Sequence, residues 1–362
     1  MKQKCLAGLL ACVLLLTACG QRPVESAAGA VPAPPPAARL FTDSAGRRVE
    51  VPGEIEKVAV SGPLAQILLF ALCPEKMVGI AEPWEAPALE YLSPEHAALP
   101  VLGQLYGGKG EMNLESLLAS GAQVVIDAGE EKKGVAEDLD ALQAQTGIPF
   151  VHISATVETA PQAFRLLGQL LGLEERAEEL AACCQDIYDR AEALGTLVEK
   201  KRVVYVTGAQ GDHVIAQGSY HGQVLELLAE NAARTGIPSA LGTGDQVDME
   251  QMMAWDPEVI LFGPGSAYDA VGEDPAWAGL SAIRSGQYYE VPTGPYNWMG
   301  FPPAVQCCLG MLWLGKLLYP EAADYDLYEE VKTYYRLFYH WDLGEEQYQA
   351  LVAHSIGKAE KR

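Results

Sequence analysis

Two stretches of this sequence decide its fold: NLESLLA (113–119) followed by VVI (124–126), and DMEQMMA (248–254) followed by VIL (259–261). They match position by position at a constant offset of 135 residues (249 − 114). Each begins with a side chain that can accept the first N–H groups of a helix, continues with apolar residues at helical spacing, and ends in a β-rich run. The repeat therefore predicts the same cap, helix and strand once in each of two lobes.

Around this repeat, short β-rich runs alternate with helical stretches, a pattern typical of βαβ units around a mainly parallel sheet. Two series of four strands are predicted, at 57–60, 77–81, 124–128 and 150–154, and at 203–207, 213–216, 259–262 and 288–291.

Residues 161–197 show no strand pattern, and between residues 180 and 194 apolar side chains recur at steps of three and four residues, on one helical face. We therefore expect an α/β fold in which one long bridging helix, at 156–198, joins two Rossmann-like lobes. The lobes are predicted at 39–155 and 199–362, with a ligand cleft between them.

The N-terminus has the layout of an export signal. In residues 1–18, Lys2 and Lys4 precede an uncharged apolar run that is short for a membrane span. Small residues lead into Cys19, and this arrangement resembles the bacterial lipoprotein box, in which the cysteine is acylated and becomes the new N-terminus. Residues 19–38 are rich in Ala and Pro, so they predict a tether rather than a core.

Composition excludes several partners. The chain has 362 residues, which suits two domains, and a formal net charge of −23. The negative electrostatic field of such a charge disfavours binding to nucleic acid and to anionic membrane surfaces. We therefore expect no nucleic acid partner and membrane association only through the lipid anchor, on the extracytoplasmic face of the cell membrane or in a periplasm.

Five cysteines remain beyond the predicted lipidation site, and none has the C-x-x-C spacing of a metal or redox site. Because free cysteine is commonly buried, we interpret them as small core residues. They are Cys73, Cys183, Cys184, Cys307 and Cys308.

Several short blocks carry a resemblance to a known family. They are VAV (58–60), GEMNLE (110–115), GQVLELL (222–228), WDPEVI (255–260) and PYNW (295–298). In order and spacing the chain resembles the iron-siderophore and cobalamin class of ABC transporter substrate-binding proteins, the class III periplasmic binding proteins. The resemblance implies two lobes on one long helix, no catalysis and no intrinsic cofactor. Its partners would be an ABC permease dimer with its ATPase, and its cargo a metal chelate such as ferric siderophore, haem or cobalamin.

The family resemblance also implies two docking residues. One acidic side chain on each lobe would pair with arginines of the permease, and the matching positions are Glu115 and Glu226. The internal repeat offers Glu250 as a competitor for the second position, although the family pattern favours Glu226. Exposed carboxylates that pair with arginine mainly steer association and fix orientation.

The ligand is expected between the lobes, where loops leave the carboxyl ends of the strands. Aromatic residues in these loops offer flat contact area, Lys109 offers a countercharge for an anionic chelate, and Tyr220 or His221 could ligate haem iron or cobalt. The predicted ligand-binding residues are Trp84, Tyr106, Lys109, Tyr220, His221, Tyr296 and Trp298.

Two other functions stay open. The sequence has no G-x-S-x-G elbow, P-loop or H-E-x-x-H motif, so we expect no enzyme. A molybdate or tungstate oxyanion could be the solute instead, held by backbone N–H groups and hydroxyls. A non-transport haem carrier or chelatase-like surface protein would share the same architecture.

Overall fold

The computed structural model describes residues 37–106, 111–239 and 241–356. The predicted signal peptide (1–18), the lipidation site Cys19, most of the tether and the predicted countercharge Lys109 lie outside the described residues. Within the described part of the chain, no helix has both the length and the apolar character needed to cross a membrane.

The first lobe is built on a parallel sheet in the order β3-β4-β5, with Val58 opposite Val124 and Val125 opposite Phe150. Its strands are nearly fully buried, as expected for a parallel sheet covered on both faces. A separate antiparallel hairpin, β1-β2, precedes it. The strands are β1 (Arg39–Thr42), β2 (Arg48–Val51), β3 (Val58–Val60), β4 (Val124–Gly129) and β5 (Phe150–Ser154).

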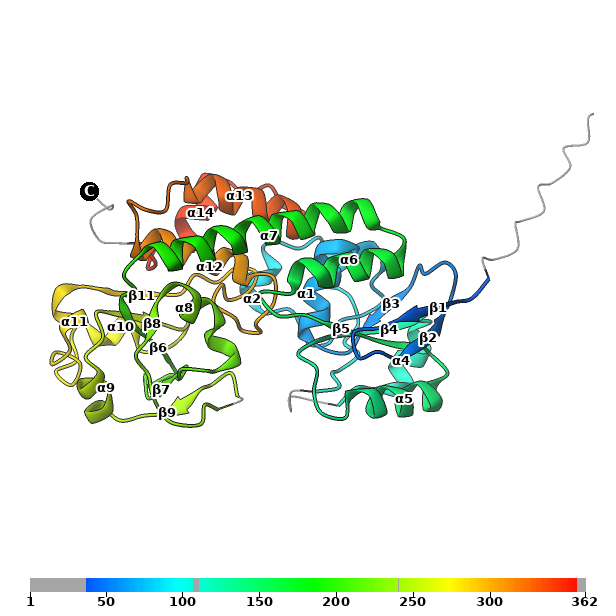
Figure 1. Ribbon diagram of the computed structural model, residues 1–362, viewed down its shortest axis with the longest axis horizontal. Coiled ribbons are helices and arrows are strands. Elements are labelled where there is room, and N and C mark those ends of the chain that lie inside the picture. The colour runs from blue at the N-terminus through cyan, green and yellow to red at the C-terminus, as the bar shows by residue number, and fades with distance from the viewer. Residues whose placement is uncertain (1–36, 107–110, 240, 357–362) are drawn as a thin grey trace, which may run out of the picture. The chain divides into compact units, whose positions relative to one another are not determined.

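Helices cover both faces of this sheet (Figure 1). Pro63 at the first position of α1 fits a helix start, because its missing N–H would have no partner there. The helices of the first lobe are α1 (Pro63–Leu72), α2 (Ala86–Leu89), α3 (Pro94–Ala97), α4 (Leu114–Ser120) and α5 (Val135–Thr146), with a 3-10 turn η1 (Pro74–Lys76).

The second lobe has a mixed sheet in the order β11-β10-β6-β7-β9, and β8 pairs with β6 beside this path. The pairs β10–β11, β6–β10 and β6–β8 are parallel, whereas β7 runs antiparallel to both of its neighbours. The strands are β6 (Arg202–Thr207), β7 (His213–Val214), β8 (Glu230–Asn231), β9 (Asp245–Gln246), β10 (Val259–Phe262) and β11 (Tyr288–Glu290).

The C-terminal helices complete the core. The helix α12 is buried along almost its whole length and packs on α8 and on α7 (Glu174–Leu197), while α13 contacts both α12 and α1 of the first lobe. The helices of this half are η2 (Tyr220–Gly222), α8 (Gln223–Leu228), α9 (Met249–Trp255), α10 (Tyr268–Val271), α11 (Ser281–Ser285), α12 (Cys307–Leu318), α13 (Leu327–Phe338) and α14 (Glu345–Leu351).

The segment between the sheets is not one helix, so the prediction of a single helix through 161–197 was wrong. It consists of α6 (Ala160–Leu171) and α7 (Glu174–Leu197), which pack against each other. Gly172 ends α6 in the left-handed conformation, with φ of 69°, which glycine adopts without strain. The helix α7 alone makes the connection that was expected, because it packs on α1 in the first lobe and on α8 and α12 in the second.

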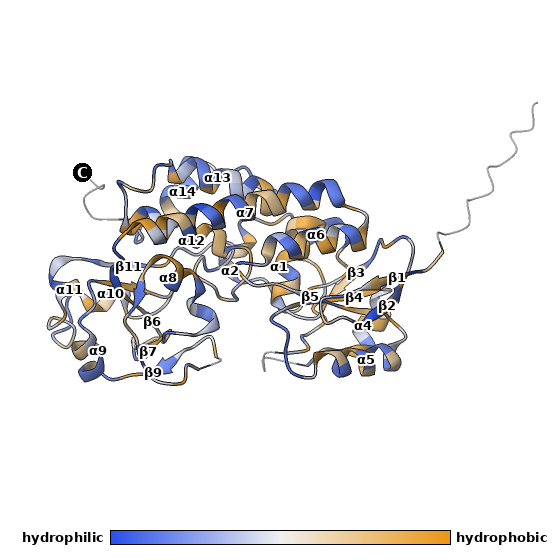
Figure 2. Cartoon of the chain, viewed as in Figure 1, coloured by the Kyte–Doolittle hydropathy of each residue, from blue (hydrophilic) through white to orange (hydrophobic). Residues whose placement is uncertain are grey.

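Most of the predicted strands are present, with two exceptions. Residues 77–81 form only isolated bridges, in which Met77 pairs with Val58 and Ile80 pairs with Val101. The segment 213–216 shortens to the two residues of β7. Figure 2 shows apolar residues gathered in the sheets and on the inner helix faces, with hydrophilic residues on the outer face of α7.

The internal repeat is confirmed. Asn113 accepts the backbone N–H of Ser116 at the start of α4, and Asp248 accepts that of Gln251 at the start of α9. Each helix is followed by a buried strand, β4 or β10. The interpretation of the cysteines as core residues also holds, since all five thiols are free and four are buried, with Cys183 partly exposed.

Candidate functional site

The first-lobe wall of the candidate site is formed by the loop after β4, which carries Lys132, and by residues 102–106, which follow the bridge between Ile80 and Val101. The Tyr106 hydroxyl donates to the Asp138 carboxylate at 2.9 Å, and the Lys132 ammonium lies 3.8 Å from the centre of the Tyr106 ring. Burial lowers the pKa of Lys132, while the nearby carboxylates of Asp127 and Glu130 oppose that shift. This wall therefore offers a cation beside an aromatic face.

A buried polar network holds this wall in place. The Ser61 hydroxyl donates to the Asp127 carboxylate, whose other oxygen lies 2.7 Å from Nδ1 of His152. Ser61 directly follows β3, Asp127 lies within β4 and His152 lies within β5, and each is at most 5% exposed. The Ser61 carbonyl accepts the N–H of Leu105 at 2.7 Å, which anchors the loop that carries Tyr106. The network fixes two loops against the same sheet end.

The second-lobe wall is formed by η2. Ser219 caps this turn and orients the half-buried side chains of Tyr220 and His221. The Tyr220 hydroxyl donates to the carbonyl of Ala155 in the first lobe at 3.2 Å, so this residue touches both lobes. Burial raises the pKa of Tyr220 well above its usual range, and the Glu130 carboxylate raises it further.

The geometry of His221 determines which of its nitrogens is available. Its Nδ1 lies 2.9 Å from the carbonyl oxygen of Gly300, and its ring stacks on Phe301 with centroids 4.9 Å apart. Because a carbonyl can only accept, Nδ1 carries the hydrogen. Burial lowers the pKa of His221, which favours the neutral form. In that form Nε2 keeps its lone pair. The structure contains several buried side-chain atoms that lack a hydrogen-bond partner, and Nε2 of His221 is not one of them.

Glu130 connects the two walls. Its exposed carboxylate is close enough to raise the pKa values of Lys132, Tyr220 and His221. Two of these residues belong to the second lobe and one to the first, so the Glu130 carboxylate acts electrostatically on residues of both lobes. We call Tyr106, Glu130, Lys132, Tyr220 and His221 the interlobe site.

Three predicted ligand contacts lie elsewhere. Trp84 is 9% exposed, donates Nε1–H to the His96 carbonyl, and packs 6.2 Å from the Tyr296 ring. Trp298 is 0% exposed, because the turn that carries it folds under α12 and its indole contacts Gly294. In this structure Trp298 is a core residue, and Trp84 and Tyr296 form a packed aromatic contact behind it.

Sequence reasoning missed Glu130 and Lys132. They follow β4 directly, at the same carboxyl edge as the predicted loops, so the rule that ligands bind beyond these strand ends would have found them. The predicted countercharge Lys109 lies outside the described residues, whereas Lys132 is described and lies over the Tyr106 ring.

The predicted docking carboxylates differ in exposure. Glu115 is exposed in the first turn of α4, and Glu250 is exposed at the equivalent position of α9. Glu226 is only partly exposed, and its carboxylate accepts the N–H of Gly218 at 2.6 Å, in the loop that leads to Tyr220. Glu226 is therefore already engaged within the second lobe.

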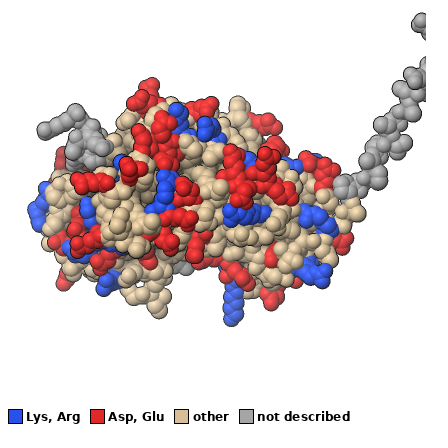
Figure 3. All heavy atoms as spheres, turned by 45° about the horizontal axis from the view of Figure 1, so that its top comes forward, with Lys and Arg blue, Asp and Glu red and all other residues tan. Residues whose placement is uncertain are grey.

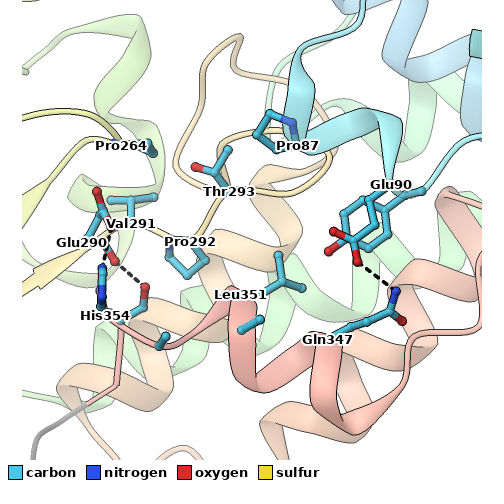
Figure 4. Close-up of a pocket in the computed structure, with 14 residues that line it drawn as sticks. Pro87, Glu90, Pro264, Glu290, Val291, Pro292, Thr293, Gln347, Leu351 and His354 are labelled. Atoms are coloured by element: carbon cyan, nitrogen blue, oxygen red, sulfur yellow. Dashed lines mark hydrogen bonds and ion pairs between the residues drawn. The ribbon is translucent and has the colours of Figure 1, made fainter.

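A cavity of about 310 Å³ lies apart from the interlobe site. It is lined by residues of α2, of α14 and of the loops after β10 and β11 (Figure 4). Glu90 and Glu290 stand on opposite sides, where Glu90 contacts Gln347 at 3.1 Å and Glu290 contacts His354 at 3.1 Å. The two carboxylates disfavour an anion in this cavity.

The molecular surface carries the acidic character of the composition. Figure 3 shows Asp and Glu side chains outnumbering Lys and Arg on the face where α7 and α13 come forward. Among the described residues, no group of three or more His, Cys, Asp and Glu is placed to hold a metal ion.

Comparisons with known proteins agree with this architecture. Residues 73–294 match the profile of a family described as "Periplasmic binding protein". An ABC transporter solute-binding protein from Sulfurospirillum deleyianum is 26% identical, with a TM-score of 0.80 over 87% of this chain and 99% of that chain. A periplasmic solute-binding protein from Veillonella parvula is also 26% identical, with a TM-score of 0.72 over 88% and 98%. Molybdate-binding protein MolA of Haemophilus influenzae is 25% identical over 331 residues, 83% of this chain and 91% of that protein.

Proposed function

Because this chain belongs to the periplasmic binding protein family, whose profile matches residues 73–294, we propose that it captures a metal chelate outside the cytoplasm for an ABC importer. The cargo would be a ferric siderophore, haem or cobalamin, passed to a permease dimer with its ATPase. The observation that carries this proposal is the His221 imidazole, whose Nδ1 is held by Gly300 while Nε2 keeps its lone pair.

The remaining residues of the interlobe site suit such a cargo. A neutral imidazole is a common ligand of iron and cobalt, and a tyrosine hydroxyl can hold haem iron. Lys132 would face the carboxylates of an anionic chelate, and the Tyr106 ring offers a flat contact surface. Tyr220 reaches the first lobe through Ala155, so a ligand there would touch both lobes.

Molybdate is the second candidate, because MolA of Haemophilus influenzae is similar over most of both chains. An oxyanion needs hydrogen-bond donors, so it would use the Lys132 ammonium and the protonated form of His221. The two solutes therefore predict opposite pH dependence. Because burial lowers the pKa of His221, its protonation requires a pH below the usual range of histidine; it removes a metal ligand but creates a hydrogen-bond donor for an oxyanion.

The test is calorimetric titration of residues 39–362 with ferric siderophores, haem, cobalamin, molybdate and tungstate at pH 7.5 and pH 5.5. We expect one chelate to bind saturably, to bind more weakly at pH 5.5, and to lose at least tenfold in affinity in His221→Ala. His213→Ala is the matched control, since that histidine pairs with Asp212 at 2.9 Å outside the interlobe site. Binding of an oxyanion alone, stronger at pH 5.5, would replace the chelate proposal.

We also propose that the protein is exported and anchored through acylated Cys19, with residues 19–38 as a tether. Support comes from the sequence of residues 1–19, which has the order of a lipoprotein signal. Cells that express the chain should incorporate labelled palmitate into it, and Cys19→Ser should release the protein from the membrane fraction. Palmitate incorporation that survives this substitution would contradict the anchor.

Docking to the permease is proposed through one carboxylate of each lobe. Glu115 serves the first lobe, and exposure at the equivalent repeat position favours Glu250 over Glu226 for the second. We expect Glu115→Lys with Glu250→Lys to abolish import while calorimetric affinity is unchanged. Glu115→Lys with Glu226→Lys should instead alter affinity too, because Glu226 holds Gly218. Normal import in the first double variant rules out that pair as the docking site.

A further inference from the structure

The cavity drawn in Figure 4 has an acidic residue on each side and little positive charge to balance them. Its volume of about 310 Å³ suits a small molecule, since ligand pockets in proteins begin near this size. Glu90 and Glu290 stand on opposite sides. Among the described residues that line the cavity there is no Lys or Arg, and the histidine there, His354, already pairs with Glu290. The cavity therefore favours a cation.

Each of the two carboxylates is held by one neighbour and keeps one oxygen for a ligand. Oε1 of Glu90 accepts a side-chain N–H of Gln347 at 3.1 Å, and Oε2 of Glu290 lies 3.1 Å from Nδ1 of His354. The other oxygen of each carboxylate has no hydrogen-bond or ion-pair partner within residues 37–106, 111–239 and 241–356. Glu90 is exposed and the Glu290 side chain is 26% exposed, so a solute can reach both.

A hydroxyl in the same wall also lacks a partner. Thr293 lines the cavity, and its hydroxyl oxygen is buried without a hydrogen-bond partner in the part of the chain that the structure describes. A buried hydroxyl without a partner costs free energy, and an ammonium group can donate to it. This hydroxyl therefore favours a ligand that carries hydrogen-bond donors, independently of the two carboxylates.

Apolar side chains separate the two carboxylates. Figure 4 shows Pro292 and Leu351 between Glu290 on one side and Glu90 on the other. Tyr91 also lines the cavity and is only 4% exposed, so it forms a firm apolar wall. Methylene groups gain free energy when they pack on such a surface. The arrangement of charge, apolar surface and charge therefore matches a molecule with the same order of groups.

We propose that this cavity is a second binding site, separate from the interlobe site, and that it takes an aliphatic diamine. One ammonium group would pair with each carboxylate, and the methylene stem would lie on the apolar residues between them. A monoamine would leave one carboxylate unpaired. A single metal ion fits poorly, because the carboxylates stand on opposite sides and the described residues contain no group of three His, Cys, Asp and Glu placed to hold one.

A bound diamine would join the two lobes. Glu90 directly follows α2 in the first lobe, whereas Glu290 ends β11 and His354 follows α14 in the second. One ion pair would form on each side, so the thermal midpoint should rise with diamine concentration, as it does for any ligand that binds only the folded state. This effect is independent of the solute in the interlobe site, so the inference does not rest on the proposed function.

The experiment is calorimetric titration of residues 19–362, carrying Cys19→Ser, with the series from 1,3-diaminopropane to 1,6-diaminohexane and with the matching monoamines. We expect one-to-one binding of at least one diamine and about tenfold weaker binding of its monoamine, the effect of one charged hydrogen bond. Glu90→Gln and Glu290→Gln should each weaken the diamine about tenfold. Glu346→Gln is the matched control, because Glu346 lies in α14 but does not line the cavity.

The comparison of diamine with monoamine on the unsubstituted protein decides the matter even where a variant fails to fold. The proposal would be overturned if no diamine binds in calorimetry or raises the thermal midpoint, or if diamine and monoamine bind equally well. Equal affinities in Glu290→Gln and Glu346→Gln would also overturn it. A loss in Glu130→Gln instead would move the diamine to the interlobe site. Binding only after removal of residues 357–362 would assign the cavity to that segment, against the proposal.

Discussion

Replacing Lys132 with methionine tests where the solute binds, and Lys133 supplies a matched control in the same loop. Both lysines are exposed to solvent, but Lys132 lies over the Tyr106 ring in the interlobe site and feels the Glu130 carboxylate. Two unit charges in contact at about 4 Å attract each other by about 1 kcal/mol in water-like surroundings. Losing that attraction should weaken the binding of an anionic chelate or oxyanion about fivefold.

The assay is calorimetric titration of Lys132→Met and Lys133→Met at low and at high ionic strength. The fivefold loss should appear for Lys132→Met at low salt and shrink at high salt, because exposed charges are screened. Lys132→Arg should keep most of the affinity. Equal affinities for the two methionine variants would refute the assignment of the interlobe site to an anionic solute.

Three further outcomes test the structure itself. A side chain at Gly310 would clash with a backbone oxygen, whereas one at Gly315 would meet side-chain atoms only. Gly310→Ala should therefore lower the free energy of unfolding by about 1–3 kcal/mol in denaturant unfolding, which is more than the loss in Gly315→Ala. Burial lowers the pKa values of His221 and His340, so the unfolded chain protonates first. The thermal midpoint should therefore fall as pH drops below about 6.5. The fall should be smaller in a variant in which both His221 and His340 are replaced by glutamine. Tyr220→Phe removes a hydrogen bond between the lobes and should cost about 1 kcal/mol in urea unfolding.

The α/β fold could be predicted because its signals are local. The capped helices at 113–119 and 248–254 are each followed by a buried strand, so residues close in sequence specify the repeated unit. The break between α6 and α7 was missed because the apolar periodicity that predicted the helix, at residues 180–194, lies entirely within α7 and says nothing of where that helix begins. Gly172 was the available signal, since glycine in the left-handed conformation commonly ends a helix.

The site was harder to predict because exposure depends on tertiary packing. Trp298 is an aromatic residue in a loop after a strand, as a ligand contact would be, yet α12 covers it completely. Glu226 matches a family position, but its carboxylate is used by Gly218, a contact that no local pattern reveals. Tyr220 and His221 were expected in the cleft, and the structure places them beside Glu130 of the other lobe.

The most direct measurement for a chelate-binding protein is the metal-centred spectrum of the bound cargo. The chelate that binds in calorimetry should show a change in its visible absorption when it binds, and that change should be absent in His221→Ala and retained in Glu290→Gln, which alters the separate cavity. The account predicts this pattern because Nε2 of His221 is the nitrogen left free to reach the metal. An unchanged spectrum in His221→Ala, with binding lost in Glu290→Gln, would contradict it and move the solute to the cavity.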